Sequence, residues 1–366
     1  MDNDSLVIVF SFLEFKDLST CILVCKQFND IICSSYLFDK LGRRDYGNEY
    51  DKVMKLSGCI GQRLHKLCYD LYKVNKKIGY NVTISDTYLE TDMHIGYLNI
   101  IDLPNEIGQL INLKVFDLCN NGISVIPNGF SRLTNLEILD LTGNNLDIFP
   151  IELCSLHNLY QLTLDSVEMQ DDLSPEVSKL TNLRILNMNW NRINCFPKEL
   201  CSLTALKELS FDFTCMKDTS PELAQLTNIK KLSLSHNFFH NFPGEICNFI
   251  KLKSLSINDS WIDSIPNTFT KLTNLKYLSM CDNKIHFIDK ICFLTQLQEL
   301  YLKGNKIIDM PRDLVKLRNL THMSINCASF DANINIIKQL TFIENLEYKY
   351  FNCREPDVYN NQYVFF

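Results

Sequence analysis

Apolar residues recur along most of the chain with a period of about 23 residues. A leucine or isoleucine opens each copy, and the steps between successive copies are 22 to 24 residues. A period kept over more than two hundred residues is typical of repeat proteins, in which each turn packs only against its neighbours. The copies begin at Leu113, Leu136, Leu159, Leu183, Leu206, Ile229, Leu252, Leu275, Leu297 and Leu320.

Within each copy, counted from this first residue, positions 1, 4 and 6 are apolar and position 9 is often asparagine. The alternation around positions 4 to 6 predicts a β-strand, in which an intervening polar residue such as Asp140 faces the opposite side from its neighbours. Most copies then reach a proline, which has no N–H donor and a fixed φ, so we expect a short helical or irregular segment on the far side. These prolines are Pro127, Pro150, Pro197, Pro243, Pro266 and Pro311.

A single copy is too small to fold alone. Its few apolar side chains stabilise it by less than the conformational entropy lost when about 23 residues are ordered. Stacking on neighbouring copies supplies the missing burial and backbone hydrogen bonds. The sequence therefore predicts one continuous stack of turns with a cap at each end.

From the second copy to the eighth, two features alternate between successive copies. Asparagine fills position 9 at Asn121, Asn144, Asn191, Asn237, Asn283 and Asn305, whereas the others have Val167, Thr214, Ser260 and Ala328. A second position, on the return segment, is cysteine in every second copy, at Cys154, Cys201, Cys247 and Cys292. We interpret the true unit as a pair of turns, which arose by duplication, and we expect the packing of the outer face to alternate as well.

The pattern resembles leucine-rich repeats of the intracellular kind that carry "IP" or "LP" after the strand. The resemblance covers residues 86–346 and implies an α/β fold, a leucine-rich-repeat solenoid of about 10 to 11 turns with a parallel β-sheet on its concave side. In that family the position-9 asparagines bond to neighbouring backbone and form a ladder, which the four substitutions interrupt here. Residues 347–366, rich in tyrosine and phenylalanine, are expected to form a C-terminal cap.

Positions 2, 3, 5, 7 and 8 of each copy are expected on the concave side, where another protein can bind. Position 8 is aromatic in three successive copies, so Trp190, Phe213 and His236 should lie side by side. Exposed aromatic residues flanked by charge are typical of protein-binding hot spots. The alternative is that these rings merely cover the edge of the sheet. The predicted target-binding residues are Trp190, Phe213, His236, Arg184, Asp212, Tyr277 and Tyr301.

The segment from Ser5 to Leu41 has apolar residues at helical spacing in three short blocks, with Asp17 well placed as a helix N-cap. About forty residues of helix contain too little core to be comfortably stable alone. The excess apolar surface requires a partner, which can be another protein or another part of this chain.

This segment resembles an F-box, a small all-α domain expected at residues 1–42. The matching features are Phe10-Ser11-Phe12-Leu13, Asp17-Leu18, Val24-Cys25-Lys26-Gln27-Phe28 and Leu37-Phe38, whereas the family's opening Leu-Pro falls on Asp2-Asn3. The resemblance implies docking onto a Skp-type adaptor and, through it, a cullin-RING ubiquitin ligase. The residues implied as adaptor-facing or core are Leu6, Phe10, Leu13, Leu18, Cys25 and Phe28.

Residues 43–85 are expected to form a helical linker or N-terminal cap. Within it, Leu64, Leu67, Cys68 and Leu71 share one helical face and basic residues occupy the other. Residues 51–80 carry seven Lys or Arg against two Asp, a local charge of +5 (7 − 2). Either the helix caps the first repeat with its basic face in solvent, or the basic face is a docking site for an acidic partner.

Composition narrows the remaining possibilities. The net charge of −7 gives no basic field for nucleic acid, and no apolar run is long enough for a membrane helix or placed as a secretion signal. Equivalent cysteines two turns apart are separated by roughly 10 Å, beyond the reach of a disulfide, so they behave as small buried apolar residues. So many unpaired thiols favour a reducing compartment, cytoplasmic or nuclear, and argue against secretion.

The sequence carries no nucleophile elbow, no glycine-rich phosphate loop and no cluster of metal ligands, so we expect no catalytic site, cofactor or metal. The F-box resemblance followed by repeats implies a substrate-recognition subunit of an SCF-type ubiquitin ligase, with the adaptor and cullin at one end and an unknown target protein on the concave face. The alternative is a non-catalytic scaffold or inhibitor without a role in ubiquitin transfer.

Overall fold

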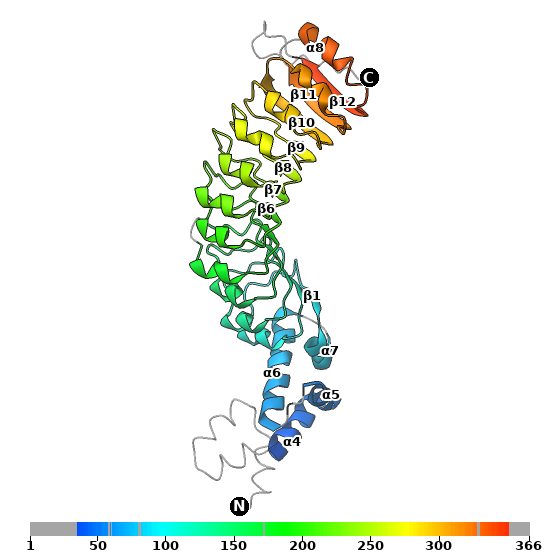
Figure 1. Cartoon of the computed structure of the whole chain (residues 1–366). Coiled ribbons are helices and arrows are strands. Elements are labelled where there is room, and N and C mark those ends of the chain that lie inside the picture. The colour runs from blue at the N-terminus through cyan, green and yellow to red at the C-terminus, as the bar shows by residue number, and fades with distance from the viewer. Residues whose placement is uncertain are drawn as a thin grey trace, which may run out of the picture. The chain divides into compact units, whose positions relative to one another are not determined.

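The computed structural model of the protein describes residues 35–57, 59, 61–79, 82–170, 173–327 and 330–350 (Figure 1). The chain divides into two compact units, Met1–Glu137 and Ile138–Phe366. The residues predicted to face the adaptor, Leu6, Phe10, Leu13, Leu18, Cys25 and Phe28, lie outside the described residues.

The described part of the first unit begins with helices and continues into repeat turns. Its strands β1 and β2 pair in parallel, with Met93 opposite Phe116. The elements are α4 (Ser35–Tyr46), α5 (Asn48–Ser57), α6 (Gly61–Ile78), α7 (Ile84–Leu89), β1 (Asp92–His94), the 3₁₀ helix η1 (Asn105–Gln109), β2 (Val115–Asp117) and η2 (Asn128–Arg132).

Helices α4 and α5 bury their apolar faces together. Leu37 and Leu41 of α4 are buried, as are Tyr50 and Val53 of α5. Gly42 lies against the ring of Tyr50, and a β-carbon at this position would overlap the ring. The close approach of the two helices therefore requires glycine here.

Helix α6 contacts the first turn of the repeats through polar side chains. The Lys73 ammonium lies 2.6 Å from a Glu106 carboxylate oxygen of η1. Gln109 Nε2 donates a hydrogen bond of 3.0 Å to the buried carboxylate of Asp70. The apolar face of the helix is buried at Leu67, Cys68 and Leu71.

The second unit is a stack of turns, each of which contributes one strand of a parallel sheet. The strands pair in register, so that Leu139 lies opposite Leu162 and Leu186 opposite Leu209. They are β3 (Ile138–Asp140), β4 (Gln161–Thr163), β5 (Ile185–Asn187), β6 (Glu208–Ser210), β7 (Lys231–Ser233), β8 (Ser254–Ser256), β9 (Tyr277–Ser279), β10 (Glu299–Ile307), β11 (His322–Cys327) and β12 (Asn345–Tyr350).

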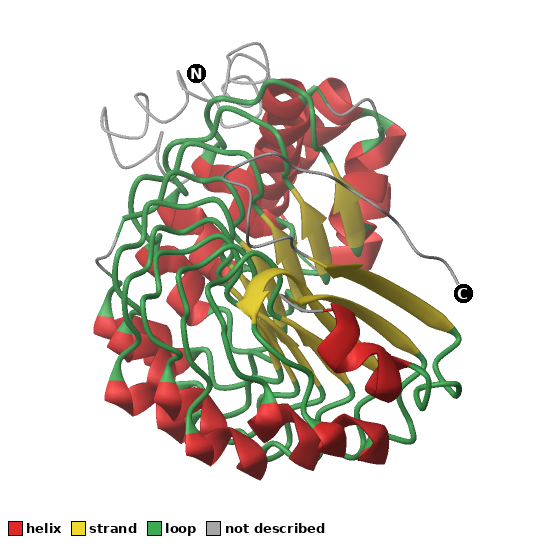
Figure 2. Ribbon diagram, turned by 90° about the horizontal axis from the view of Figure 1, so that it is seen from above, coloured by secondary structure: helices red, strands yellow, loops and turns green. Residues whose placement is uncertain are grey.

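Short 3₁₀ helices form the opposite side of these turns, and Figure 2 shows them separated from the strands. The predicted prolines occupy the residue before a helix, as Pro150 does with φ −70°. The 3₁₀ helices are η3 (Ile151–Ser155), η4 (Pro175–Lys179), η5 (Lys198–Ser202), η6 (Pro221–Gln225), η7 (Gly244–Asn248), η8 (Asn267–Lys271), η9 (Asp289–Phe293) and η10 (Arg312–Lys316). An α-helix, α8 (Phe330–Ile337), connects β11 to β12 along the chain.

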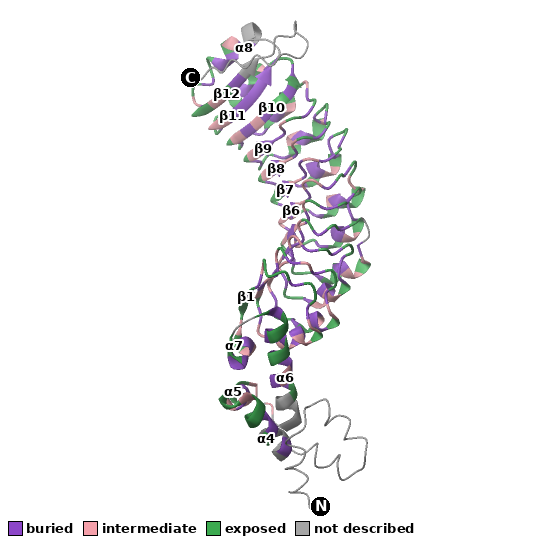
Figure 3. Cartoon of the chain, turned by 180° about the vertical axis from the view of Figure 1, so that it is seen from behind, coloured by how far each residue is buried: buried purple, intermediate pink, exposed green. Residues whose placement is uncertain are grey.

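The core lies between the strands and the 3₁₀ helices. Positions 1, 4 and 6 of the copies are buried. In one copy these residues are Leu136, Leu139 and Leu141. Figure 3 shows buried residues alternating with exposed ones along the turns. The predicted solenoid with a parallel sheet is confirmed. Strands β1 and β12 add turns before and after the ten copies identified from the leucine pattern.

Five of the position-9 asparagines serve two turns: Asn121, Asn191, Asn237, Asn283 and Asn305. Asn191 Oδ1 accepts from the N–H groups of Val167 (3.2 Å) and Met169 (3.0 Å) in the preceding turn. Its Nδ2 donates to Leu164 O of the preceding turn (2.8 Å) and to Met188 O of its own (2.9 Å). The turn containing Val167 therefore has its backbone satisfied by the next turn. Val167 itself has no side-chain acceptor for the turn before it, so the predicted interruption of the ladder concerns that preceding turn.

The same arrangement holds at Thr214 and Ser260, whereas Ala328 lies outside the described residues. Asn237 Oδ1 accepts from the N–H groups of Thr214 (3.3 Å) and Met216 (2.9 Å). Asn283 Oδ1 accepts from Ile262 N (3.2 Å) and its Nδ2 donates to Ile257 O (2.9 Å), in the turn that contains Ser260. In these turns the asparagine of the following turn accepts from the backbone N–H groups.

The outer face also alternates, as expected. Cys154, Cys201, Cys247 and Cys292 are buried. The equivalent residues of the intervening turns are exposed at Ser178 and half-buried at Ala224 and Thr270. The predicted alternation of packing is confirmed, whereas its origin by duplication remains a hypothesis.

Candidate protein-binding surface

Three rings predicted to lie side by side form a continuous stack. The ring centroids of Trp190 and Phe213 are 3.7 Å apart, those of Phe213 and His236 are 3.8 Å apart, and both pairs are within 9° of parallel. His236 Nδ1 lies 2.9 Å from Asp259 Oδ2, which ends the series. We call Trp190, Phe213 and His236 the aromatic stack. Trp190 is 58% exposed, although a large aromatic ring is usually mostly buried.

The backbone at the aromatic stack is left-handed. Trp190 has φ 58°, and Phe213 and His236 both have φ 57°. The same conformation recurs at position 8 of other turns, where small or polar residues accept it more readily than bulky ones. An L-residue in this conformation costs about 1–2 kcal/mol. Those other residues are Tyr97, Asn120, Gly143, Ser166, Asp259, Asp282 and Gly304.

A ladder of short polar side chains lies beside the aromatic stack, at position 7. Each side chain accepts a hydrogen bond from the position-7 N–H of the next turn. Asp165 accepts from Asn189 N (2.7 Å), Asn189 from Asp212 N (2.7 Å), Asp212 from Ser235 N (2.6 Å), Ser235 from Asn258 N (3.0 Å) and Asn258 from Cys281 N (2.7 Å). This ladder was not predicted from the sequence, although a run of Asp, Asn and Ser at one repeat position is a signal that could have indicated it.

Asp212 has a supporting role in this geometry. Its carboxylate also accepts from Ser233 Oγ at 2.7 Å. Burial raises the pKa of Asp212, although its hydrogen bonds and the nearby His236 act in the opposite direction. Burial likewise raises the pKa of Asp165, and the charges of Asp140 and Asp212 add to the effect. Asp212 therefore holds the backbone next to Phe213.

The other predicted target-binding residues are not part of the aromatic stack. Tyr277 and Tyr301 form a separate pair, with ring centroids 5.6 Å apart. The Tyr301 hydroxyl donates to Glu299 (2.9 Å), and burial together with that carboxylate raises its pKa to about 12. Arg184 is exposed at position 2, at the other end of strand β5 from Trp190.

A second aromatic cluster, which the sequence analysis missed, follows the stack at positions 10 and 12. The ring centroid of Trp261 is 5.6 Å from that of Phe238 and 4.9 Å from that of His240. Lys284 Nζ lies 5.3 Å from the Trp261 centroid. Trp261 is 44% exposed, so both tryptophans of the chain are surface residues. The sequence did offer a signal for this cluster: the chain has only two tryptophans, and they stand at nearby positions of their repeats.

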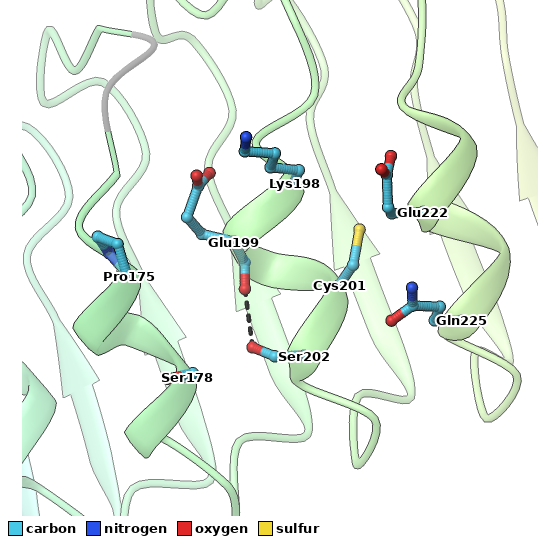
Figure 4. Close-up of a pocket in the computed structure, with 8 residues that line it drawn as sticks. All are labelled: Pro175, Ser178, Lys198, Glu199, Cys201, Ser202, Glu222 and Gln225. Carbon is cyan, nitrogen blue, oxygen red and sulfur yellow. Dashed lines mark hydrogen bonds between the residues drawn. The ribbon is translucent and has the colours of Figure 1, made fainter.

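A hollow of about 420 Å³ lies on the opposite side, over η4, η5 and η6 (Figure 4). Burial raises the pKa of the Cys201 thiol to about 11, which keeps it protonated and a poor nucleophile. Ser202 Oγ donates to Glu199 O (2.8 Å) and has no histidine beside it in the lining. The lining residues are Pro175, Ser178, Lys198, Glu199, Cys201, Ser202, Glu222 and Gln225.

Comparison with protein families decides the class of the molecule. The family described as leucine-rich repeat region matches residues 87–220 and 217–359. The chain is a leucine-rich-repeat protein. The family described as F-box-like matches residues 3–44, so this leucine-rich-repeat protein carries an F-box-like segment near its N-terminus. Both families typically act as non-catalytic interaction modules.

Solved structures agree with this repeat fold. A leucine-rich-repeat protein of Leptospira interrogans is 29% identical with a TM-score of 0.57, over 69% of this chain and 70% of the other. The functional domain of InlJ from Listeria monocytogenes is 19% identical with a TM-score of 0.61, over 79% and 61%. An internalin of Listeria monocytogenes, InlF, is 20% identical with a TM-score of 0.51, over 76% and 94%. The two Listeria proteins support the fold alone.

A search of curated protein sequences finds no match. Among the described helices, none is both long enough and apolar enough to cross a membrane.

Proposed function

We propose that the protein is the substrate-recognition subunit of an SCF-type ubiquitin ligase. The F-box-like segment docks a Skp-type adaptor and, through it, a cullin, while the exposed face of the parallel sheet binds a target protein. The family match at residues 3–44 supports the first half of the proposal. Ubiquitin transfer is then carried out by the recruited enzymes, and this protein contributes by holding the target near them.

The aromatic stack is the observation that carries the second half. Trp190 is exposed, and the three rings occupy left-handed positions where small polar residues fit better. Strained residues cluster at functional sites, and tryptophan is enriched among binding hot spots. Stacking between rings contributes roughly 0.5–1.5 kcal/mol per pair, which offsets part of the strain but leaves the exposed ring unexplained. Binding of a protein surface accounts for that exposure.

The adaptor half is tested by co-purification from cells that contain an SCF system. The double substitution Phe10→Asp and Leu13→Asp should remove the adaptor and the cullin from the purified complex, because charge replaces two residues of the implied docking set. A matched control is Ile148→Asp with Phe287→Asp, which changes two exposed apolar residues of the repeats. Equal recovery of the adaptor with both variants would instead favour the scaffold or inhibitor.

A further inference from the structure

Five basic residues form a line across the sheet, at the N-terminal ends of five neighbouring strands. Each stands immediately before a strand, from β5 to β9, and their backbones are joined directly. The N–H of each donates to the carbonyl oxygen of the previous one, at 2.8, 2.7, 2.8 and 2.8 Å in order. We call Arg184, Lys207, Lys230, Lys253 and Lys276 the basic row.

The charge of the basic row is not balanced within the protein. In the described part of the chain, none of the five side chains has an ion-pair partner. At the same repeat position in the first unit, Lys114 Nζ lies 3.3 Å from a Glu137 carboxylate oxygen. At the next position along the strands, Glu208 lies opposite Lys231, so those two charges offset each other and leave the row unbalanced.

This arrangement is unfavourable for the isolated protein. Like charges on neighbouring strands, about 4.8 Å apart, destabilise a sheet. Four of the five side chains are exposed and Lys207 is half-buried, so they are available to a partner. The net charge of the whole chain is −7, so the row is a local positive field on an acidic protein.

The surface beside the basic row carries short, polar side chains. Position 5 of β6 to β9 carries short hydroxyl side chains, which leave room for a bound chain. The aromatic stack lies at the other end of β5, β6 and β7, up to about 20 Å from the row at 3.3 Å per residue. The hydroxyl residues are Ser210, Ser233, Ser256 and Ser279.

We propose that the basic row binds an acidic segment of the target protein, a run of Asp and Glu in extended conformation lying across β5 to β9. The row spans roughly 19 Å, the length of about six extended residues. This inference rests on the proposed function, in which the sheet face holds the target. It adds the chemistry of the bound segment: carboxylates at the row and apolar side chains toward the aromatic stack.

Protein is favoured over nucleic acid by the geometry of the rings. Single-stranded nucleic acids bind proteins by stacking bases on open aromatic faces. Both faces of Phe213 are covered by its neighbours Trp190 and His236. The acidic net charge also opposes a long polyanion, whereas a short acidic segment of a folded protein contacts only the row.

The experiment selects displayed random peptides on the intact protein and measures the binding of the selected peptides by fluorescence polarisation. The peptides should be enriched in Asp and Glu, and raising the salt concentration should weaken their binding. The triple substitution Lys230→Glu, Lys253→Glu and Lys276→Glu should weaken binding by about tenfold or more.

A control variant carries the same charge change away from the sheet face. Lys198→Glu, Lys217→Glu and Lys271→Glu alter exposed lysines that lie outside the strands and the basic row, and they should change affinity by no more than about twofold. Circular dichroism verifies that both variants are folded. Selection of peptides without acidic enrichment, or equal losses in both variants, would overturn the inference.

Two further probes separate the classes of partner. A single-stranded oligouridine and vesicles containing phosphatidylserine are measured with the same variants. Binding of either probe that depends on the row, with no dependence for the peptides, overturns the acidic-segment inference in favour of that partner. If adaptor recovery and target binding through the aromatic stack persist while the acidic peptides fail, the proposed function stands and only this inference is lost.

Discussion

The turns that carry the aromatic stack and the turns that follow them share one backbone but differ in their position-8 side chains. Phe213 and Asp282 differ by only 3° in φ (57° and 54°), yet one is a bulky ring and the other a small polar residue. Asp fits the left-handed conformation, and Phe does so at a cost. In a repeat protein, a departure from what the shared backbone prefers therefore indicates where a constraint other than folding operates.

The largest expected effect concerns the shared backbone itself. Asn237→Ala should lower the free energy of unfolding by roughly 3 kcal/mol, because the buried N–H groups of Thr214 and Met216 lose their acceptor. Urea unfolding measures the difference. Asn248→Ala, which removes one hydrogen bond at an exposed position, is the control and should cost less than about 0.5 kcal/mol. Equal losses of unfolding free energy in the two variants would show that the hydrogen bonds from Asn237 to the preceding turn do not contribute to stability.

Replacing the aromatic stack should separate binding from folding. Trp190→Asn with Phe213→Asn should weaken binding of a target by about 2 kcal/mol or more, since hot-spot residues contribute on that scale. The midpoint of thermal unfolding should stay level or rise, because asparagine tolerates the left-handed conformation. Calorimetry of binding and of unfolding measures both. Ile148→Asn with Phe287→Asn is the matched control, and a target that binds all forms equally would place the binding surface elsewhere.

The glycine turn tests the cost of the shared conformation directly. Gly304→Ala should destabilise the protein by about 1–2 kcal/mol, because φ is 75° and the new β-carbon would meet the side chain and backbone of Asp282. Gly244→Ala is the control, because nothing lies near its β-carbon position. Thermal unfolding of both variants measures the difference, which should vanish if the conformation is not strained for alanine.

The smallest effect is expected in the position-7 ladder. The folded-state pKa of Asp212 is raised, so its charged form is disfavoured by folding and the residue costs stability once the pH exceeds that pKa. Asp212→Asn, a residue that the ladder already uses at Asn189 and Asn258, should raise stability at neutral pH. The gain should disappear as the pH falls below the ordinary aspartate range. A gain that is independent of pH would contradict this explanation.

The fold could be predicted from the sequence because apolar residues recur at fixed positions. Leu139 and Leu209, for example, occupy the same position in their two turns. The turn containing β1 was not among the copies identified, because Glu90 stands where the others have leucine or isoleucine. The side-by-side placement of Trp190, Phe213 and His236 was also predictable, since parallel strands bring equal positions together. Their role in binding stays a proposal.

Other features depend on direction and distance, which a repeat pattern does not contain. Val167 and Thr214 were interpreted as gaps in the asparagine ladder, and the sequence did not show that Asn191 and Asn237 accept from the backbone of those two turns. Asp212 was predicted to bind the target, which stays a prediction, and the sequence did not show that its carboxylate accepts hydrogen bonds from Ser233 and Ser235. A polar residue on a strand can contact a partner or support its own backbone, and only its neighbours distinguish the two.

The backward reach of the asparagines restricts how the length of this protein can change. Between Asn144 and Asn283, where asparagine alternates with other residues at position 9, losing one asparagine-bearing turn would strand the backbone donors of the turn before it. Losing two adjacent turns of this stretch together would keep the alternation. Natural or engineered versions with longer or shorter recognition surfaces should therefore differ by even numbers of turns.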